Sequence, residues 1–157
     1  MTSPGPTDWE RRPPLRFSDL APGRELGPIP FETSSRLVER YVAITGNDDP
    51  LFRDAAAARA AGLAGPVLPP GLAGVWARQS YLGSHRMLPG GVMAGQDVEL
   101  LAAALVGAPL RLAARVAAVD PADPRRRVVL HCTARDPAGV LVGRVSIDAR
   151  WPPDEAP

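Results

Sequence analysis

Two neighbouring carboxylates, Asp48 and Asp49, stand in the loop GNDDP between two predicted helices. A loop carboxylate can act as a general base, but an Asp-Asp-Pro run is also a common turn former that accepts hydrogen bonds from nearby N–H groups. His85, in the loop GSHRMLPGG, is the histidine best placed for proton transfer, and it would also suit an exposed loop position. These three residues are the candidate acid–base groups.

Composition excludes several other kinds of catalytic and metal-binding site. Cys132 is the single cysteine, so an internal disulfide or a cysteine-based zinc site is excluded. His85 and His131 are far apart in sequence, and no metal site is predicted. All 18 basic residues are Arg, which removes lysine Schiff-base chemistry. A formal net charge of +1 with scattered arginines does not favour nucleic acid as a partner.

The ends of the chain differ in composition from its middle. Residues 1–14 and 152–157 are rich in proline and lack apolar periodicity, so we expect flexible arms around a single domain at 15–151. The longest apolar run, Leu100 to Val106, is far shorter than the roughly 20 residues that cross a bilayer. With no signal-like apolar core near the start, we expect a cytoplasmic protein that does not enter a membrane.

Helical periodicity dominates the first half of the domain. After a short predicted strand at 28–33, a helix is expected to begin at Thr33 or Ser34 and to end at Gly46. Asp54 is expected to cap a short alanine-rich helix. A third helix, predicted from Gly71 to Leu82, is the most apolar and should be central. Its predicted buried face consists of Leu72, Val75, Trp76 and Leu82.

The second half has a period of two. Residues 110–118, 128–134 and 141–151 alternate apolar and polar positions, which predicts antiparallel strands with one wet face. Cys132 falls on the apolar face and His131 on the polar face, so a buried inert thiol and a solvent-facing imidazole are expected. The run 91–106 is predicted to form another strand, buried on more of its surface. The fold class is therefore α+β, with an antiparallel sheet wrapped around a central helix.

Several local motifs occur in the same order as in one known family. They are Asn47-Asp48-Asp49-Pro50-Leu51-Phe52, Asp54, Gly62-Leu63, Leu68-Pro69-Pro70-Gly71, Gly95-Gln96 and Val106-Gly107. With this spacing, the chain resembles the MaoC-like (R)-specific enoyl-CoA hydratase/dehydratase family of the hotdog-fold superfamily. In that family the loop reads Asp-x-Asn-Pro-Leu/Ile-His, and the central helix starts with Ile-Ala-His-Gly. The resemblance covers about residues 17–151 and implies a hotdog fold.

The departures from the family pattern concern its chemistry. Family members use the first Asp and the last His of the loop to hold and activate a water molecule. The resemblance places Asn47 and Phe52 at those positions, and Pro70 where the family has a His before the helix glycine. Neither Asn nor Phe can take part in general acid–base transfer. We therefore expect the usual dyad to be replaced, leaving Asp49, Asp48 or His85 as substitutes.

The binding part of the family site is retained. The resemblance implies that the Gly71 N–H polarises a thioester carbonyl at the helix start, although Pro70-Gly71 would also simply begin a helix. The expected substrate-binding residues are Gly71, Pro70, Asn47, Phe52 and Tyr81, the last as part of an acyl tunnel. The basic cluster at 125–127 would suit the phosphates of coenzyme A or of a carrier-protein arm, or a solvated hairpin turn.

These observations favour an acyl-thioester-binding protein, a non-catalytic or altered subunit that works with a catalytic hotdog partner on enoyl or 3-hydroxyacyl thioesters. The alternative is a stand-alone enzyme with a rewired site, acting as a dehydratase, isomerase, cyclase or thioesterase in secondary metabolism. A third possibility is a binding or scaffolding domain without chemistry.

If the chain is active, a hydro-lyase reaction is expected. The expected partners are acyl-CoA or an acyl carrier protein and a second hotdog subunit in a homo- or hetero-oligomer. No cofactor is expected beyond the coenzyme A or phosphopantetheine of the substrate.

Overall fold

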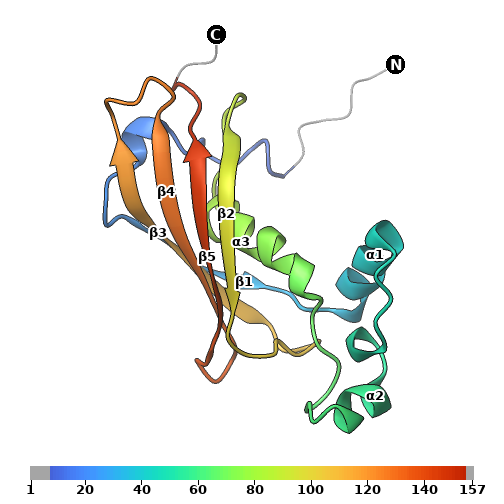
Figure 1. The fold of residues 1–157 in the computed structure, drawn as a ribbon. Coiled ribbons are helices and arrows are strands. Elements are labelled where there is room, and N and C mark those ends of the chain that lie inside the picture. Colours follow the sequence, from blue (N-terminus) through green and yellow to red (C-terminus); the bar gives the residue numbers. More distant parts are fainter. Residues whose placement is uncertain (1–7, 155–157) are drawn as a thin grey trace, which may run out of the picture.

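The computed structural model describes residues 8–154, and within them one antiparallel sheet has the strand order β1-β3-β4-β5-β2. The sheet curves around helix α3, as Figure 1 shows. The strands are β1 (Glu25–Phe31), β2 (Val92–Leu100), β3 (Leu110–Asp120), β4 (Arg127–Arg135) and β5 (Leu141–Arg150). The predicted α+β class and the sheet wrapped around a central helix are both confirmed. No described helix is long and apolar enough to cross a membrane.

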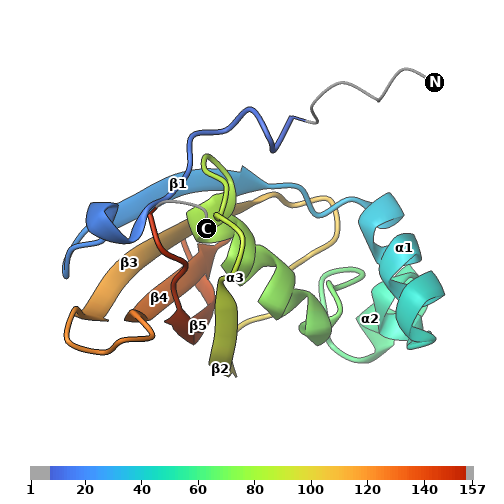
Figure 2. The same ribbon diagram turned by 90° about the horizontal axis from the view of Figure 1, so that it is seen from above.

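Three α-helices occur in the described residues: α1 (Ser35–Thr45), α2 (Ala55–Ala60) and α3 (Ala73–Leu82). Helix α1 begins where the Ser34 side chain accepts a hydrogen bond from the Leu37 N–H at 3.3 Å. It ends at Gly46, whose φ of 69° lies in the left-handed region that glycine tolerates. Asp54 caps α2 as predicted. Helices α1 and α2 lie together near the start of α3, beyond the sheet (Figures 1 and 2).

Helix α3 packs its inner face on the sheet, where it contacts β1, β3, β4 and β5. Its buried residues are Ala73, Trp76, Ala77, Ser80, Tyr81 and Leu82. This i, i+3, i+4, i+7, i+8 pattern leaves position 75 on the outside of the helix. The prediction that Val75 shares the buried face is therefore wrong, since its residue is 46% exposed.

Strand β2 is the other departure from expectation. The prediction of a mostly buried strand through 91–106 is wrong, because β2 ends at Leu100 and lies at the edge of the described sheet. Its large apolar residues Val92, Met93, Val98 and Leu100 are 45–58% exposed. Within the described residues β2 pairs with β5 alone, so its free edge has unpaired backbone groups.

The alternation predicted for the remaining strands holds. On β4, Val128, Leu130, Cys132 and Ala134 are fully buried, while His131 is exposed on the opposite face. Burial raises the pKa of the Cys132 thiol to about 11, so the thiolate is scarce at neutral pH. Cys132 is a core residue and not a nucleophile.

The described chain ends make specific contacts with the domain. Residues 1–7 and 155–157 of the predicted arms lie outside the described part. The Pro13 carbonyl accepts a hydrogen bond from the Arg86 N–H at 3.0 Å. The Asp154 carboxylate accepts one from the Phe17 N–H at 2.6 Å. The bond between Pro13 and Arg86 places the segment before residue 15 against the loop that follows α3, as Figure 2 also shows.

Candidate functional site

A cavity of about 460 Å³ lies beside the start of α3. Its walls come from parts of residues 47–52, 67–72 and 100–104, together with Trp76 and Val142. Most of these side chains are apolar, which suits an acyl chain. The cavity brings together four of the residues that the sequence singled out: Asn47, Asp49, Phe52 and Pro70.

Short-range hydrogen bonds hold the 47–52 loop in place. Asp49 caps the 3₁₀ turn Pro50–Phe52 by accepting the Leu51 N–H at 2.9 Å. The Leu51 carbonyl in turn accepts the Val67 N–H at 3.0 Å. The loop is therefore fixed against the segment that leads into α3, and both segments form the cavity wall.

Asn47 and Phe52, the two positions where the resemblance places the acid–base pair, have no titratable side chain. Phe52 is 6% exposed, belongs to the hydrophobic core and lines the cavity, at the position where the resemblance places a histidine. Asn47 lines the cavity, and its N–H donates to Thr45 Oγ1 at 3.2 Å. Neither residue can move a proton between substrate and water.

The neighbouring carboxylates have different environments. Asp48 forms an ion pair with Arg53 and is absent from the cavity wall. Asp49 is the one ionisable side chain among the described residues that line the cavity. Its Oδ1 accepts the Leu51 N–H, and no donor from the described residues engages Oδ2. Asp49 therefore combines the predicted turn role with access to the site.

The start of α3 presents two hydrogen-bond donors. Gly71 is not itself a lining residue, but it lies between the lining residues Pro70 and Leu72, and no described residue accepts a hydrogen bond from its N–H. A Cβ atom at position 71 would collide with the Tyr41 hydroxyl oxygen and lie 3.0 Å from the ring carbon Cζ. The Tyr41 hydroxyl also has no hydrogen-bond partner within residues 8–154. Both donors lie near the positive end of the α3 dipole.

Tyr41 does not line the cavity, but its hydroxyl lies against Gly71, and the sequence did not indicate this contact. The apolar stripe of α1 indicated only that the Tyr41 ring packs inward, and the ring does pack against the core. No local signal shows where its hydroxyl ends, because Gly71 is thirty positions later in the chain.

Tyr81 and His85 lie outside this cavity. Tyr81 is buried on the inner face of α3, with its ring centroid 6.2 Å from that of Trp151, and burial raises its pKa to about 12. His85 follows the far end of α3, where its Nδ1 lies 2.9 Å from Ser84 Oγ. The length of α3, about 15 Å for ten residues, separates it from the cavity.

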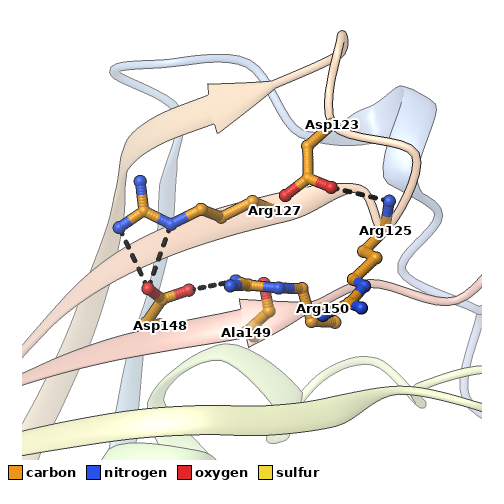
Figure 3. A network of polar contacts seen from close by, with 6 residues as sticks. All are labelled: Asp123, Arg125, Arg127, Asp148, Ala149 and Arg150. Atoms are coloured by element: carbon orange, nitrogen blue, oxygen red, sulfur yellow. Dashed lines mark hydrogen bonds and ion pairs between the residues drawn. The ribbon is translucent and has the colours of Figure 1, made fainter.

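The arginine cluster at 125–127 is a structured hairpin turn. Arg127 donates to the Asp148 carboxylate from Nε at 3.0 Å and pairs with it through Nη2 at 2.9 Å (Figure 3). Arg126 Nε donates to the Trp151 carbonyl at 3.0 Å, and the Arg125 N–H donates to Asp123. Arg127 and Arg126 thus have partners within the described residues, in agreement with the hairpin-turn interpretation. Among the described residues, no group of three or more His, Cys, Asp or Glu could hold a metal ion.

Comparison with known proteins agrees with this geometry. A family model described as FAS1-like, dehydratase domain region, matches residues 21–142. The R-hydratase PhaJ1 of Pseudomonas aeruginosa superposes with a TM-score of 0.75 at 18% identity, over 90% of this chain and 93% of that one. The MaoC-like dehydratase of Rhodospirillum rubrum gives 0.71 at 18% identity, over 88% and 99%. No curated protein matches the chain.

A heteromeric assembly is also among the similar structures. The HadBC complex, a 3R-hydroxyacyl-ACP dehydratase of Mycobacterium tuberculosis, gives a TM-score of 0.71 at 21% identity, over 82% of this chain and 95% of that one. At such identities the likeness concerns the fold, and it confirms the predicted hotdog architecture.

Proposed function

Because this chain belongs to the FAS1-like dehydratase-region family of MaoC-like hotdog proteins, we propose that it binds acyl thioesters as a non-catalytic or altered subunit of a hydratase or dehydratase. A catalytic hotdog partner would act on the enoyl or 3-hydroxyacyl thioester. One observation carries this proposal. The cavity is suited to an acyl chain, but Asn47 and Phe52 occupy the two positions where the resemblance places the acid–base pair.

The cavity provides binding and polarisation. Its apolar walls hold the acyl chain, and the Gly71 N–H donates to the thioester carbonyl oxygen at the start of α3. The Tyr41 hydroxyl, which lies against Gly71, supplies a second donor to the same region. Negative charge that develops on the carbonyl oxygen is stabilised by these donors and by the helix dipole.

Hydration of the double bond also needs a base that activates water and an acid that protonates the carbon next to the thioester carbonyl. Asn47 and Phe52 supply neither, so a partner subunit with an intact Asp-x-Asn-Pro-x-His loop completes the reaction. The exposed apolar edge strand β2 is consistent with a second subunit covering this side of the sheet. The HadBC complex shows that this fold occurs in a dehydratase made of different subunits.

A titration of a catalytic partner with this chain tests the proposal. A hotdog protein with the intact loop is assayed for hydration of crotonyl-coenzyme A at increasing amounts of this chain. We expect no turnover by this chain alone and a saturable rise in the partner's turnover. Turnover by this chain alone, abolished by Asp49→Asn, would overturn the subunit role.

The position of Asp49 favours one second candidate, a stand-alone hydro-lyase with a rewired site. Asp49 lines the cavity with one carboxylate oxygen free of donors from the described residues, so it could accept a proton from water or substrate. The Tyr41 hydroxyl would then be the proton donor. In either case the thioester carrier belongs to the substrate, and no further cofactor is needed.

A further inference from the structure

Strand β2 forms a free edge of the described sheet, and its two faces carry different side chains (Figure 1). Gln96 points to the inner face, since a Cβ atom at Gly74 of α3 would lie 3.4 Å from the Gln96 Nε2. Successive side chains of a strand alternate, so Val98 shares this inner face, whereas Asp97 and Glu99 lie on the outer face. The edge is therefore apolar toward α3 and acidic toward the outside.

The apolar side of this edge has no cover within the described residues. Val98 and Leu100 of β2 are exposed, and so is Val75, which follows Gly74 on α3. The free edge of β2 also has unpaired backbone groups. A strand from another subunit can satisfy these groups and bury the apolar side chains at the same time.

The acidic side of the edge is electrostatically unbalanced. Asp97 lies opposite Ser146 of β5 and forms no ion pair with a described residue. Glu99 lies opposite Arg144, with 3.4 Å between Oε2 and Nη1, and this pair is weak because both side chains are more than half exposed. Both carboxylates line a hollow of about 450 Å³, whose other ionisable groups are His131 and Arg144. The hollow leaves room for a basic side chain beside the unpaired Asp97.

A second copy of β2 would match the apolar side and not the acidic side. Two antiparallel copies related by a two-fold axis pair residues that point to the same face. Pairing centred on Asp97 places this residue opposite its own copy, and pairing centred on Val98 places Asp97 opposite Glu99 twice. Pairing centred on Gln96 makes the two Asp97 side chains diagonal neighbours. Because like charges in facing positions destabilise a sheet, these central registers are disfavoured.

We propose that β2 pairs with the edge strand of a different subunit, whose residues facing Asp97 and Glu99 are arginine or lysine and whose inward-facing residues are apolar. The two carboxylates thus select against a second copy of this chain. The identity of that subunit as a hotdog hydratase or dehydratase rests on the proposed function, whereas the charge requirement rests on β2 itself.

A charge-swapped form of this chain tests the selection directly. The double variant Asp97→Lys with Glu99→Lys carries the required basic face on an otherwise identical edge. Sedimentation equilibrium measures the association of the unmodified chain, of the variant and of their equimolar mixture. We expect the mixture to associate at least about tenfold more tightly than either chain alone, and this difference should shrink at high salt. Hydrogen exchange of the β2 amides should slow in the mixture.

The double variant Glu32→Lys with Glu39→Lys is the matched control, because it makes the same change of net charge at exposed positions before and within α1. Mixed with the unmodified chain, it should give no added association. Self-association of the unmodified chain as tight as that of the charge-swapped mixture would overturn the proposal. A charge-swapped mixture that does not associate would also overturn it, because the carboxylates would then not be what keeps two copies apart.

The two proposals can fail separately. Association in the charge-swapped mixture, with no effect of this chain on the turnover of a hydratase partner, would reject the thioester function and retain the charge selection. If this chain raises that turnover and the Asp97→Lys, Glu99→Lys variant raises it equally, the thioester function stands and the charge selection is rejected.

Discussion

The Tyr41 hydroxyl lies against Gly71 at the first turn before α3, so closely that a Cβ atom at position 71 would collide with it. This contact joins α1 to the start of the central helix. It also places a side-chain donor beside a backbone N–H that has no acceptor among the described residues. The arrangement explains why a glycine is required there on steric grounds, in addition to its proposed role with a thioester.

Gly71→Ala should therefore destabilise the protein and disturb the site. The added methyl group forces the Tyr41 ring to move, and such overpacking costs about 1–3 kcal/mol of unfolding free energy. Urea denaturation measures the loss. Combining Gly71→Ala with Tyr41→Phe should restore part of the stability, because the closest atom is then removed. A stability of Gly71→Ala equal to that of the unmodified protein would contradict the contact.

Tyr41→Phe alone should separate function from folding. The ring remains packed and the lost hydroxyl has no partner among the described residues, so the unfolding free energy should change by less than about 0.5 kcal/mol. Turnover of crotonyl-coenzyme A by the complex should fall about tenfold or more, as when a carbonyl-stabilising donor is lost. An unchanged kcat with unchanged stability would remove the hydroxyl from the proposed site.

Phe52→Ala should be strongly destabilising, because Phe52 is 6% exposed and packs in the core. Removing a buried phenyl ring typically costs about 3–5 kcal/mol. Chemical denaturation gives the value, and Ile44→Ala serves as a control because Ile44 is 81% exposed. A cost below about 1 kcal/mol would show that Phe52 does not close the cavity wall as described.

The Arg127–Asp148 pair gives a pH dependence of defined sign. The hydrogen bond from Arg127 holds the pKa of Asp148 below its usual value, so the folded protein binds this proton less readily than the unfolded chain. The resulting stabilisation is fully present above the unfolded pKa, roughly 4, and is lost as the pH falls through the lower folded pKa. It is small because both side chains are partly exposed.

Urea midpoints of the unmodified protein and of Asp148→Asn, compared at pH 7 and at strongly acidic pH, measure this contribution. The unmodified protein should be more stable at pH 7, and the difference should shrink as Asp148 is protonated. A difference that grows on acidification would reverse the assigned sign.

The sequence predicted the elements whose signals are local. Ser34 and Gly46 at the ends of α1, Asp54 before α2 and the alternation around Cys132 all depend on near neighbours along the chain. The motifs around residues 47–52 and 68–71 also pointed correctly to segments that meet in one cavity. These features were predictable because each one depends on residues that lie close together in the sequence.

Other features depend on tertiary pairing and could not be predicted in this way. An apolar strand such as β2 has the same pattern at the edge of a sheet as in its centre. Its exposure depends on whether another strand pairs with its second side, which the pattern does not show. Val75 was misplaced because two adjacent apolar residues on a helix do not show which one faces the sheet. The hollow that Trp9 and Arg12 form with α3 lies partly in the segment interpreted as an arm, where no periodic pattern indicates packing.

In the proposed complex this chain binds the thioester while its partner transfers the protons. The most direct measurement is hydration of crotonyl-coenzyme A by the assembled complex after the Asp and His of the partner's loop have been replaced. We expect that this complex still binds crotonyl-coenzyme A and shows no turnover. Retained turnover that disappears on Asp49→Asn in this chain would contradict it and establish Asp49 as the base.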